Sequence, residues 1–213
     1  MTLAQPEVQV QQPKAKTRRK KVPRALVYEM RRGRPIYYRD YEKVLRGELP
    51  LEAVMGSSVL QALLIDLIVR FFHKMLDVTR YLVLYNEIGF QIAPRTWRNL
   101  DIAVFERRAL EAEGLPDRMT TVPPLLVVEV DTKADLSRYE GQMEWYIREK
   151  VDDLLAAGVR QVVWFTTRDR RVLDARPDQP WVLDRWTRPV PLVVEDLTLH
   201  LPTLFEETGM TLE

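Results

Sequence analysis

The sequence contains no cysteine and only two histidines, His73 and His200. The lack of cysteine excludes disulfides, thiolate zinc sites, iron–sulfur clusters and cysteine nucleophiles. The two histidines lie far apart in the sequence and neither has a His-x-x-x-His companion, which argues against a histidine-rich zinc site. Any catalysis is therefore expected to depend on carboxylates and lysines.

Several other features are also missing. The sequence has no run of about 18 apolar residues and no recognisable secretory signal, so we expect a cytoplasmic protein without a membrane-spanning helix. It has no glycine-rich phosphate loop and no Gly-x-Ser-x-Gly elbow, which disfavours P-loop NTPases and α/β-hydrolases. Hydrophobic residues make up 46% and charged residues 30% of the 213 residues. These values fit one globular domain with a hydrophobic core.

Positive charge is concentrated near the N-terminus, although the net charge of the chain is only +1. Residues 1–25 are polar and rich in lysine and arginine. We interpret them as a flexible basic arm that precedes a domain spanning residues 26–213. The arm is suited to bind the phosphates of nucleic acid, but the same composition also fits a solubilising tail.

The rest of the chain alternates between helical and strand patterns. An apolar face at helical spacing predicts a helix over residues 51–76, with Ser57 or Ser58 as its N-cap. The other predicted elements are strands over 81–85, 88–92, 100–105, 125–130 and 161–166, a charged loop between 105 and 125, a helix over 135–157, and a hairpin over 171–186. Because a long helix joins the two most apolar strands, we expect them to be parallel neighbours. The predicted fold is an α/β domain with a mixed sheet flanked by helices.

Two acidic residues occupy positions where a charge is costly. Asp101 opens an apolar strand, and Glu129 lies near the end of the most hydrophobic strand. A buried carboxylate needs a partner or a metal ion, because alone it costs several kcal/mol. Two carboxylates on adjacent strands, near the carboxyl end of one of them, would suit Mg²⁺ or Mn²⁺. The structural alternative is ion pairing, with these partners: Lys133, Arg138 or Lys150 for Glu129, and Arg98 for Asp101.

Two lysines are candidates to complete such a site. Lys133 would share a face with Glu129 if the strand continued beyond it. Lys150 lies about two turns before the end of the second predicted helix, and from there its ammonium could point back at the carboxylates. The alternative for Lys150 is a surface position, paired with Glu144 or Asp153.

These motifs, in this order, resemble the Uma2-type (DUF820) endonuclease family of the PD-(D/E)XK nuclease superfamily. The family pattern is a Pro-Asp that opens a short apolar strand, an apolar strand ending Glu-Val-x-Ser, a helix with Lys-x-x-x-Tyr-x-x-x-Gly-Val, and a strand with an aromatic pair. The matching segments are Leu100–Phe105, Leu126–Thr132, Lys150–Val159 and Gln161–Phe165. The resemblance covers roughly residues 26–206.

The chain also departs from the family pattern. Asp131 occupies the lysine position of a strict Glu-x-Lys motif, so the resemblance points to Lys150 as the catalytic lysine, with Lys133 as the alternative. Three further positions differ: Leu100 for the proline, Thr132 for the serine and Leu154 for the helix tyrosine.

The resemblance implies a restriction-endonuclease-like fold and a Mg²⁺- or Mn²⁺-dependent endonuclease acting on DNA. The implied metal ligands are Asp101, Glu129 and the carbonyl of Val130, with Asp131 or Glu87 as an optional further acid. Lys150 would orient the attacking water or help to deprotonate it. DNA would be bound mainly through its phosphates, and a homodimer would suit the cutting of both strands.

Two rival hypotheses remain open at this stage. One is a protein that keeps the fold without catalysis and binds nucleic acid or another protein, which the missing proline and tyrosine support. The other is a hydrolase that acts on a small phosphate compound.

Overall fold

The computed structural model of the protein describes residues 22–211. Residues 1–21, which form most of the predicted basic arm, lie outside the described part. The strands of the main sheet are β1 (Val27–Arg31), β2 (Arg34–Tyr37), β3 (Tyr81–Ala93), β4 (Thr96–Glu106), β5 (Leu126–Val130), β6 (Gln161–Thr166), β7 (Arg171–Ala175) and β8 (Val182–Arg185). They are ordered β2-β1-β4-β5-β6-β7-β8, with β3 paired to β4. A small second sheet pairs β9 (Val190–Pro191) with β10 (Thr198–Leu199).

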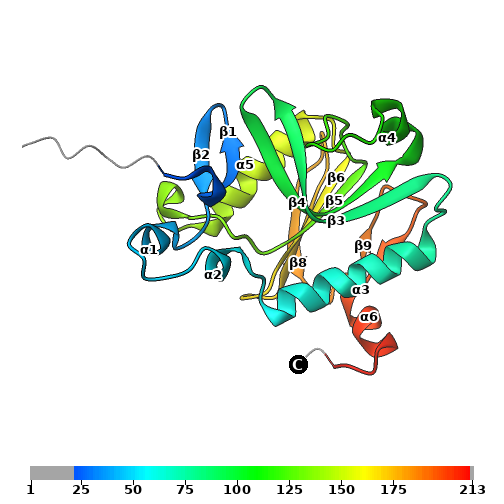
Figure 1. Cartoon of the computed structure of the whole chain (residues 1–213). Coiled ribbons are helices and arrows are strands. Elements are labelled where there is room, and N and C mark those ends of the chain that lie inside the picture. The colour runs from blue at the N-terminus through cyan, green and yellow to red at the C-terminus, as the bar shows by residue number, and fades with distance from the viewer. Residues whose placement is uncertain (1–21, 212–213) are drawn as a thin grey trace, which may run out of the picture.

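Helices lie on both faces of the main sheet (Figure 1). The α-helices of the described residues are α1 (Tyr41–Leu45), α2 (Glu52–Met55), α3 (Val59–Met75), α4 (Arg107–Glu113), α5 (Met143–Ala156) and α6 (Leu201–Glu207). Two short 3₁₀ helices are η1 (Arg24–Leu26), which includes the last residues of the predicted arm, and η2 (Ser137–Tyr139). Among these helices, none is long and apolar enough to cross a membrane. The predicted α/β fold, a mixed sheet flanked by helices in one domain, is confirmed.

Each face of the main sheet buries its own hydrophobic core. On one face, Ile68 of α3 and Leu204 of α6 belong to the same cluster as Val128 of β5. On the other face, Leu154 of α5 belongs to a cluster with Val127 of β5. Because successive residues of a strand point to opposite faces, Glu129 lies on the α5 face together with Val127.

The central pair of strands has the predicted direction. β5 and β6 are parallel, with Val128 opposite Val163, and α5 lies in the connection between them. β4 runs antiparallel to β5. The parallel pair brings the carboxyl ends of β5 and β6 to the same edge of the sheet, where α/β proteins place ligands.

Several predicted boundaries were wrong. The helix expected over 51–76 is interrupted at Gly56, whose ψ of 157° is extended, and restarts at Ser58, whose side chain accepts a hydrogen bond from the backbone N–H of Gln61. The helix expected over 135–157 begins only at Met143, because the chain before it turns through left-handed conformations at Glu140 and Gly141. The charged stretch expected as a loop contains α4, and the hairpin of β1 and β2 was not predicted.

Candidate active site

Asp101 and Glu129 lie side by side on two central strands. The antiparallel pairing of Ile102 with Val128 brings Asp101 of β4 next to Glu129 of β5. The backbone N–H of Val130 donates a hydrogen bond of 2.8 Å to Oδ2 of Asp101. Both acids are buried, with 7% of Asp101 and 1% of Glu129 exposed. The sheet therefore brings the two predicted acids together.

An irregularity in β3 lies opposite Asp101. The pairing of β3 with β4 shifts between Tyr85 and Ile88, and the two residues between them, Asn86 and Glu87, have positive φ angles of 79° and 56°. Such bulges redirect side chains and are frequent next to active sites. Burial raises the pKa of Asp101, and the nearby carboxylate of Glu87 adds to this shift. Glu87 therefore lies close to the candidate site.

Lys150 reaches the two strands from α5. Its Nζ donates hydrogen bonds of 2.9 Å to Oε2 of Glu129 and 2.6 Å to the carbonyl oxygen of Asn99. The same ammonium lies 3.0 Å from Oε1 of Glu29. Burial alone would lower the pKa of Lys150, but the carboxylates of Glu129, Glu29 and Asp101 outweigh it and raise the pKa. Lys150 is therefore a buried, protonated member of the site, and the alternative of a surface lysine is wrong.

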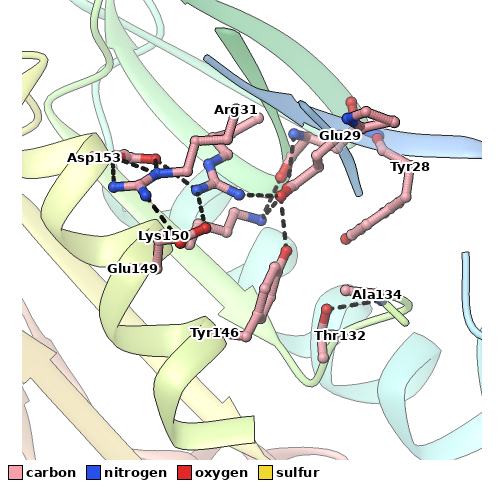
Figure 2. A network of polar contacts seen from close by, with 12 residues as sticks. Tyr28, Glu29, Arg31, Thr132, Ala134, Tyr146, Glu149, Lys150 and Asp153 are labelled. Carbon is pink, nitrogen blue, oxygen red and sulfur yellow. Dashed lines mark hydrogen bonds and ion pairs between the residues drawn. The ribbon is translucent and has the colours of Figure 1, made fainter. Parts of the chain in front are cut away.

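Glu29 of β1 is a site residue that sequence reasoning missed. Its side chain is fully buried and collects four polar contacts, shown in Figure 2. Oε2 accepts hydrogen bonds from Arg98 at 2.7 Å and from the Tyr146 hydroxyl at 2.8 Å. Oε1 accepts from the backbone N–H of Asn99 at 3.1 Å and lies beside Lys150. Burial raises the pKa of Glu29, but Lys150 and Arg98 reverse this and lower it.

Arg98 does not neutralise Asp101, so this predicted alternative is wrong. The Arg98 guanidinium is fully buried and bonds to acids of β1 and α5 instead. On α5 it lies 2.5 Å from Asp153 and 3.2 Å from Glu149. Arg31 bonds to the same two acids at 2.9 Å each, as Figure 2 shows. Through Arg98, this network links Glu29 to Glu149 and Asp153 on α5.

The buried part of the site carries more negative than positive charge. The carboxylates of Glu29, Asp101 and Glu129 face Arg98 and Lys150, while the third buried cation, Lys133, is already paired with the carboxylate of Glu87. Oε1 of Glu129 is buried and has no hydrogen-bond partner among the described residues. Burial raises the pKa of Glu129 well above its usual range, although Lys150 opposes the shift. A cation beside Asp101 and Glu129 would remove this imbalance.

The donor atoms available to a cation are all oxygens. Among residues 22–211, no group of three His, Asp or Glu side chains is arranged to hold a metal ion. The third donor next to Asp101 and Glu129 is the carbonyl oxygen of Val130, which accepts a 2.7 Å hydrogen bond from Nε2 of Gln61 on α3. A carbonyl oxygen has two lone pairs, so one remains for a metal. Two carboxylates and a carbonyl fit a hard divalent ion such as Mg²⁺.

The remaining candidates have other partners. β5 ends at Val130, and Asp131, with a φ of 57°, turns away from the strand. Its oxygens accept hydrogen bonds from the backbone N–H of Thr167 at 2.7 Å and the Thr167 hydroxyl at 2.5 Å. The structure therefore does not support Asp131 as a metal ligand. Lys133, the alternative catalytic lysine, bonds to Glu87 rather than to Glu129.

Comparisons with known proteins bear on the fold. No protein-family model matches the sequence, and a search of the curated proteins finds no match either. Among solved structures, one similar chain is a protein from Anabaena variabilis ATCC 29413 described as a "putative nuclease belonging to DUF820". The two chains share 16% identity and superpose with a TM-score of 0.51 over 72% of this chain and 79% of the other.

This chain has the fold of a DUF820 protein. The resemblance noted in the sequence motifs is thus confirmed at the level of the fold, a mixed sheet with flanking helices. At this level of identity the likeness concerns architecture, and function has to be argued from the site.

Proposed function

We propose that this protein is a divalent-metal-dependent endonuclease that hydrolyses phosphodiester bonds in DNA. The observation that carries the proposal is the meeting of Asp101 and Glu129 with Lys150, from two strands and a helix, beside a buried carboxylate oxygen that has no partner among the described residues. Neither acid forms an ion pair with an arginine in residues 22–211. The nuclease-like fold supports the same reading.

Asp101, Glu129 and the carbonyl of Val130 are the residues that would hold Mg²⁺ or Mn²⁺. Bound there, the ion would polarise a phosphate and lower the pKa of an attacking water. The backbone N–H of Val130 holds Oδ2 of Asp101 in place by a hydrogen bond. This bond fixes the orientation of the whole carboxylate, so Oδ1 also has a defined position. Gln61 fixes the carbonyl of Val130 in a similar way.

Lys150 would stabilise the negative charge that builds on the phosphate during hydrolysis. Its pKa is raised by Glu129 and Glu29 in spite of burial, which favours a permanently charged ammonium over a base that removes a proton from water. Glu29 would act as a positioning residue, because its Oε1 lies 3.0 Å from the ammonium of Lys150 that also bonds to Glu129.

One observation favours a second candidate function, a non-catalytic module that binds nucleic acid or protein. Only 7% of Asp101, 1% of Glu129 and none of Lys150 are exposed, and Lys150 already has two carboxylate partners. A buried ion-pair network of this kind can serve the specificity of a fold rather than chemistry. The two candidates differ in their dependence on metal.

The test is cleavage of supercoiled plasmid DNA by the full chain with Mg²⁺, Mn²⁺ or EDTA. The wild type should cut only with metal. Asp101→Asn, which keeps an acceptor for the N–H of Val130, should lower the rate by at least about 100-fold, the size typical of removing one charge-stabilising group. The matched control is Asp66→Asn, which changes an exposed acid of α3 that pairs with Arg70 and should leave cleavage within about threefold of the wild type.

A Mn²⁺ titration by calorimetry supplies a readout besides activity. The wild type and Asp66→Asn should bind Mn²⁺, and Asp101→Asn should not. Cleavage by Asp101→Asn at the wild-type rate would overturn the proposal. DNA binding that needs no metal and is unchanged in Asp101→Asn, together with no cleavage by the wild type, would establish the second candidate instead.

A further inference from the structure

Four arginines gather where β6 and β8 end and β7 begins. Arg171 of β7 lies directly opposite Arg185 of β8, and the turn between β6 and β7 adds Arg168 and Arg170. All four residues are exposed. Within residues 22–211, none of these guanidinium groups takes part in an ion pair or a hydrogen bond, in contrast to Arg188 nearby, which pairs with Asp184. We call these four residues the arginine cluster.

The arginine cluster has an electrostatic cost. Like charges directly opposite each other on neighbouring strands destabilise a sheet, and Arg171 and Arg185 form such a pair. The nearest acids are engaged elsewhere, since Asp184 pairs with Arg188 at 3.7 Å and Asp169 accepts a hydrogen bond from the hydroxyl of Thr166. Repulsion that the protein itself does not relieve indicates an anionic partner.

The arginine cluster lies on the same face and at the same edge of the sheet as the candidate active site. Glu129 is in register, through Trp164 of β6, with Leu173 of β7 and Leu183 of β8. Arg171 and Arg185 each lie two residues further toward the edge, which puts them on the same face as Glu129. With about 4.8 Å between strands and about 3.3 Å per residue, the Cα of Arg171 is about 12 Å from that of Glu129.

The turn that carries Arg168 and Arg170 is tied to the end of β5. The backbone N–H and the hydroxyl of Thr167 both bond to the carboxylate of Asp131, at 2.7 Å and 2.5 Å. Asp131 directly follows Val130, the proposed carbonyl donor of the metal site. These two bonds therefore hold the turn at a fixed position relative to the proposed metal site. Asp131 thus anchors the turn rather than binding a metal ion.

We propose that the arginine cluster binds backbone phosphates of the same DNA strand that is cut at Asp101 and Glu129. This inference rests on the proposed function. Phosphates of one strand are spaced about 3.4 Å apart along the helix axis, so the cluster would contact the strand within about four nucleotides of the scissile bond. Guanidinium groups suit this task because they bind two phosphate oxygens at once.

The test is binding of a fluorescent DNA duplex to the full chain in EDTA, followed by anisotropy over a series of salt concentrations. The double variant Arg171→Gln/Arg185→Gln removes two phosphate contacts. Its slope of log K against log salt should be smaller by about 1.8, which corresponds to about 30-fold weaker binding at 0.15 M salt. The matched control is Arg108→Gln/Arg160→Gln, two exposed arginines that line one hollow beside Leu125, at the opposite end of β5. The control should bind as the wild type does.

A stability measurement separates a binding role from a structural one. Because the substitution removes a repulsive pair, the double variant should melt at the same temperature as the wild type or higher. A lower melting temperature together with weaker binding would point to a structural role and overturn the inference.

The remaining outcomes separate the inference from the proposed function. If Asp101→Asn abolishes cleavage while Arg171→Gln/Arg185→Gln binds DNA with an unchanged slope, only the inference fails. If the wild type neither binds nor cuts DNA, both fail. A calorimetric titration with inorganic phosphate tests whether the arginine cluster is instead a site for a small anion. Tight phosphate binding that the double variant loses, with an unchanged DNA slope, would overturn the assignment to nucleic acid.

Discussion

Glu29 and Glu129 are two buried glutamates that both contact Lys150, but their pKa values shift in opposite directions. Both lie within 3.0 Å of the Lys150 ammonium. Glu29 also receives Arg98, Tyr146 and a backbone N–H, and its pKa is lowered in spite of burial. Glu129 has one oxygen without a partner in the described structure, and burial raises its pKa. The first glutamate therefore stabilises the fold, and the second carries a cost that a bound cation would relieve.

We predict that Glu29→Gln destabilises the protein by about 3–5 kcal/mol at pH 7, because it leaves Arg98 and Lys150 with too few carboxylates. The lowered pKa of Glu29 means that its charge contributes stability above its ordinary pKa of 4.5, and that this contribution is lost as the pH falls through the folded value. The difference between variant and wild type should therefore shrink as the pH falls below 4.5. Urea denaturation at several pH values measures it.

Glu129→Gln is the matched comparison for that prediction. The raised pKa of Glu129 means that it contributes stability only at low pH, and that this contribution is lost as the pH rises through the folded value. At pH 7 the uncharged glutamine should therefore be neutral or stabilising, while it still accepts a hydrogen bond from Lys150. Equal losses of stability at pH 7 in the two variants would contradict the contrast drawn between the two glutamates.

Which site residues could be found from the sequence depended on the hydrophobic pattern around them. Asp101 and Glu129 could be predicted because each interrupts or borders an apolar strand, and Lys150 because of its family spacing. Glu29 lies in the alternating segment Tyr28–Arg31, a pattern typical of a strand with one solvent-exposed face. That face is instead covered by α5, whose Tyr146 and Lys150 contact Glu29. Only tertiary packing makes this glutamate a site residue.

At the scale of the elements, prediction was most reliable for the apolar centre of the sheet. Residues 100–105, 125–130 and 161–166 correspond to β4, β5 and β6, since continuous apolar runs suit strands buried on both faces. The helix expected from residue 135 starts at Met143 because local hydrogen bonds compete, such as that from the N–H of Ser137 to Asp135. The hairpin of β1 and β2 was missed because its strands have only five and four residues, too few for their alternation to stand out from the charged residues around them.

The start of α3 connects a helix cap to the candidate site. Ser58 caps the helix by accepting a 3.1 Å hydrogen bond from the N–H of Gln61, whose side chain in turn bonds to the carbonyl of Val130. We predict that Ser58→Ala lowers stability by about 1 kcal/mol. For a domain of this size that corresponds to about 2–4 °C in melting temperature, measured by thermal denaturation.

Ser57→Ala is the control for the cap, because the Ser57 side chain makes no hydrogen bond to a described residue. Its effect should stay within about 0.5 kcal/mol. A loss in Ser57→Ala as large as in Ser58→Ala would show that the cap assignment is wrong.

At the scale of the whole molecule, charge is divided between the arm and the domain. Lys14, Lys16, Arg18, Arg19, Lys20 and Lys21 lie outside the described residues, and without residues 1–21 the rest of the chain is net negative. Such a domain would repel DNA at long range unless local clusters compensate. We therefore expect the arm to contribute to the affinity for DNA without contributing to the chemistry.

We predict that replacing the six basic residues between Lys14 and Lys21 by glutamine weakens DNA binding and lowers its salt slope by up to about 5. Because the chain keeps its length, the change in DNA binding reports the loss of charge and not the loss of residues. Anisotropy over a salt series measures the change, with thermal denaturation to show that stability is unaffected. An unchanged slope would assign the arm the role of a solubilising tail.

The candidate site also draws its groups from distant parts of the chain. Tyr146 and Glu29 bond across 117 residues, and the acids between them come from the two strands in the middle of the main sheet. Such long-range pairings form late, since loop closure must precede them. During synthesis, a nascent chain in which α5 has not yet been made lacks Lys150 altogether. Hydrolytic competence would therefore arise only once β1, β4, β5 and α5 have all been made and packed together, so translation products that end before α5 would be harmless to DNA.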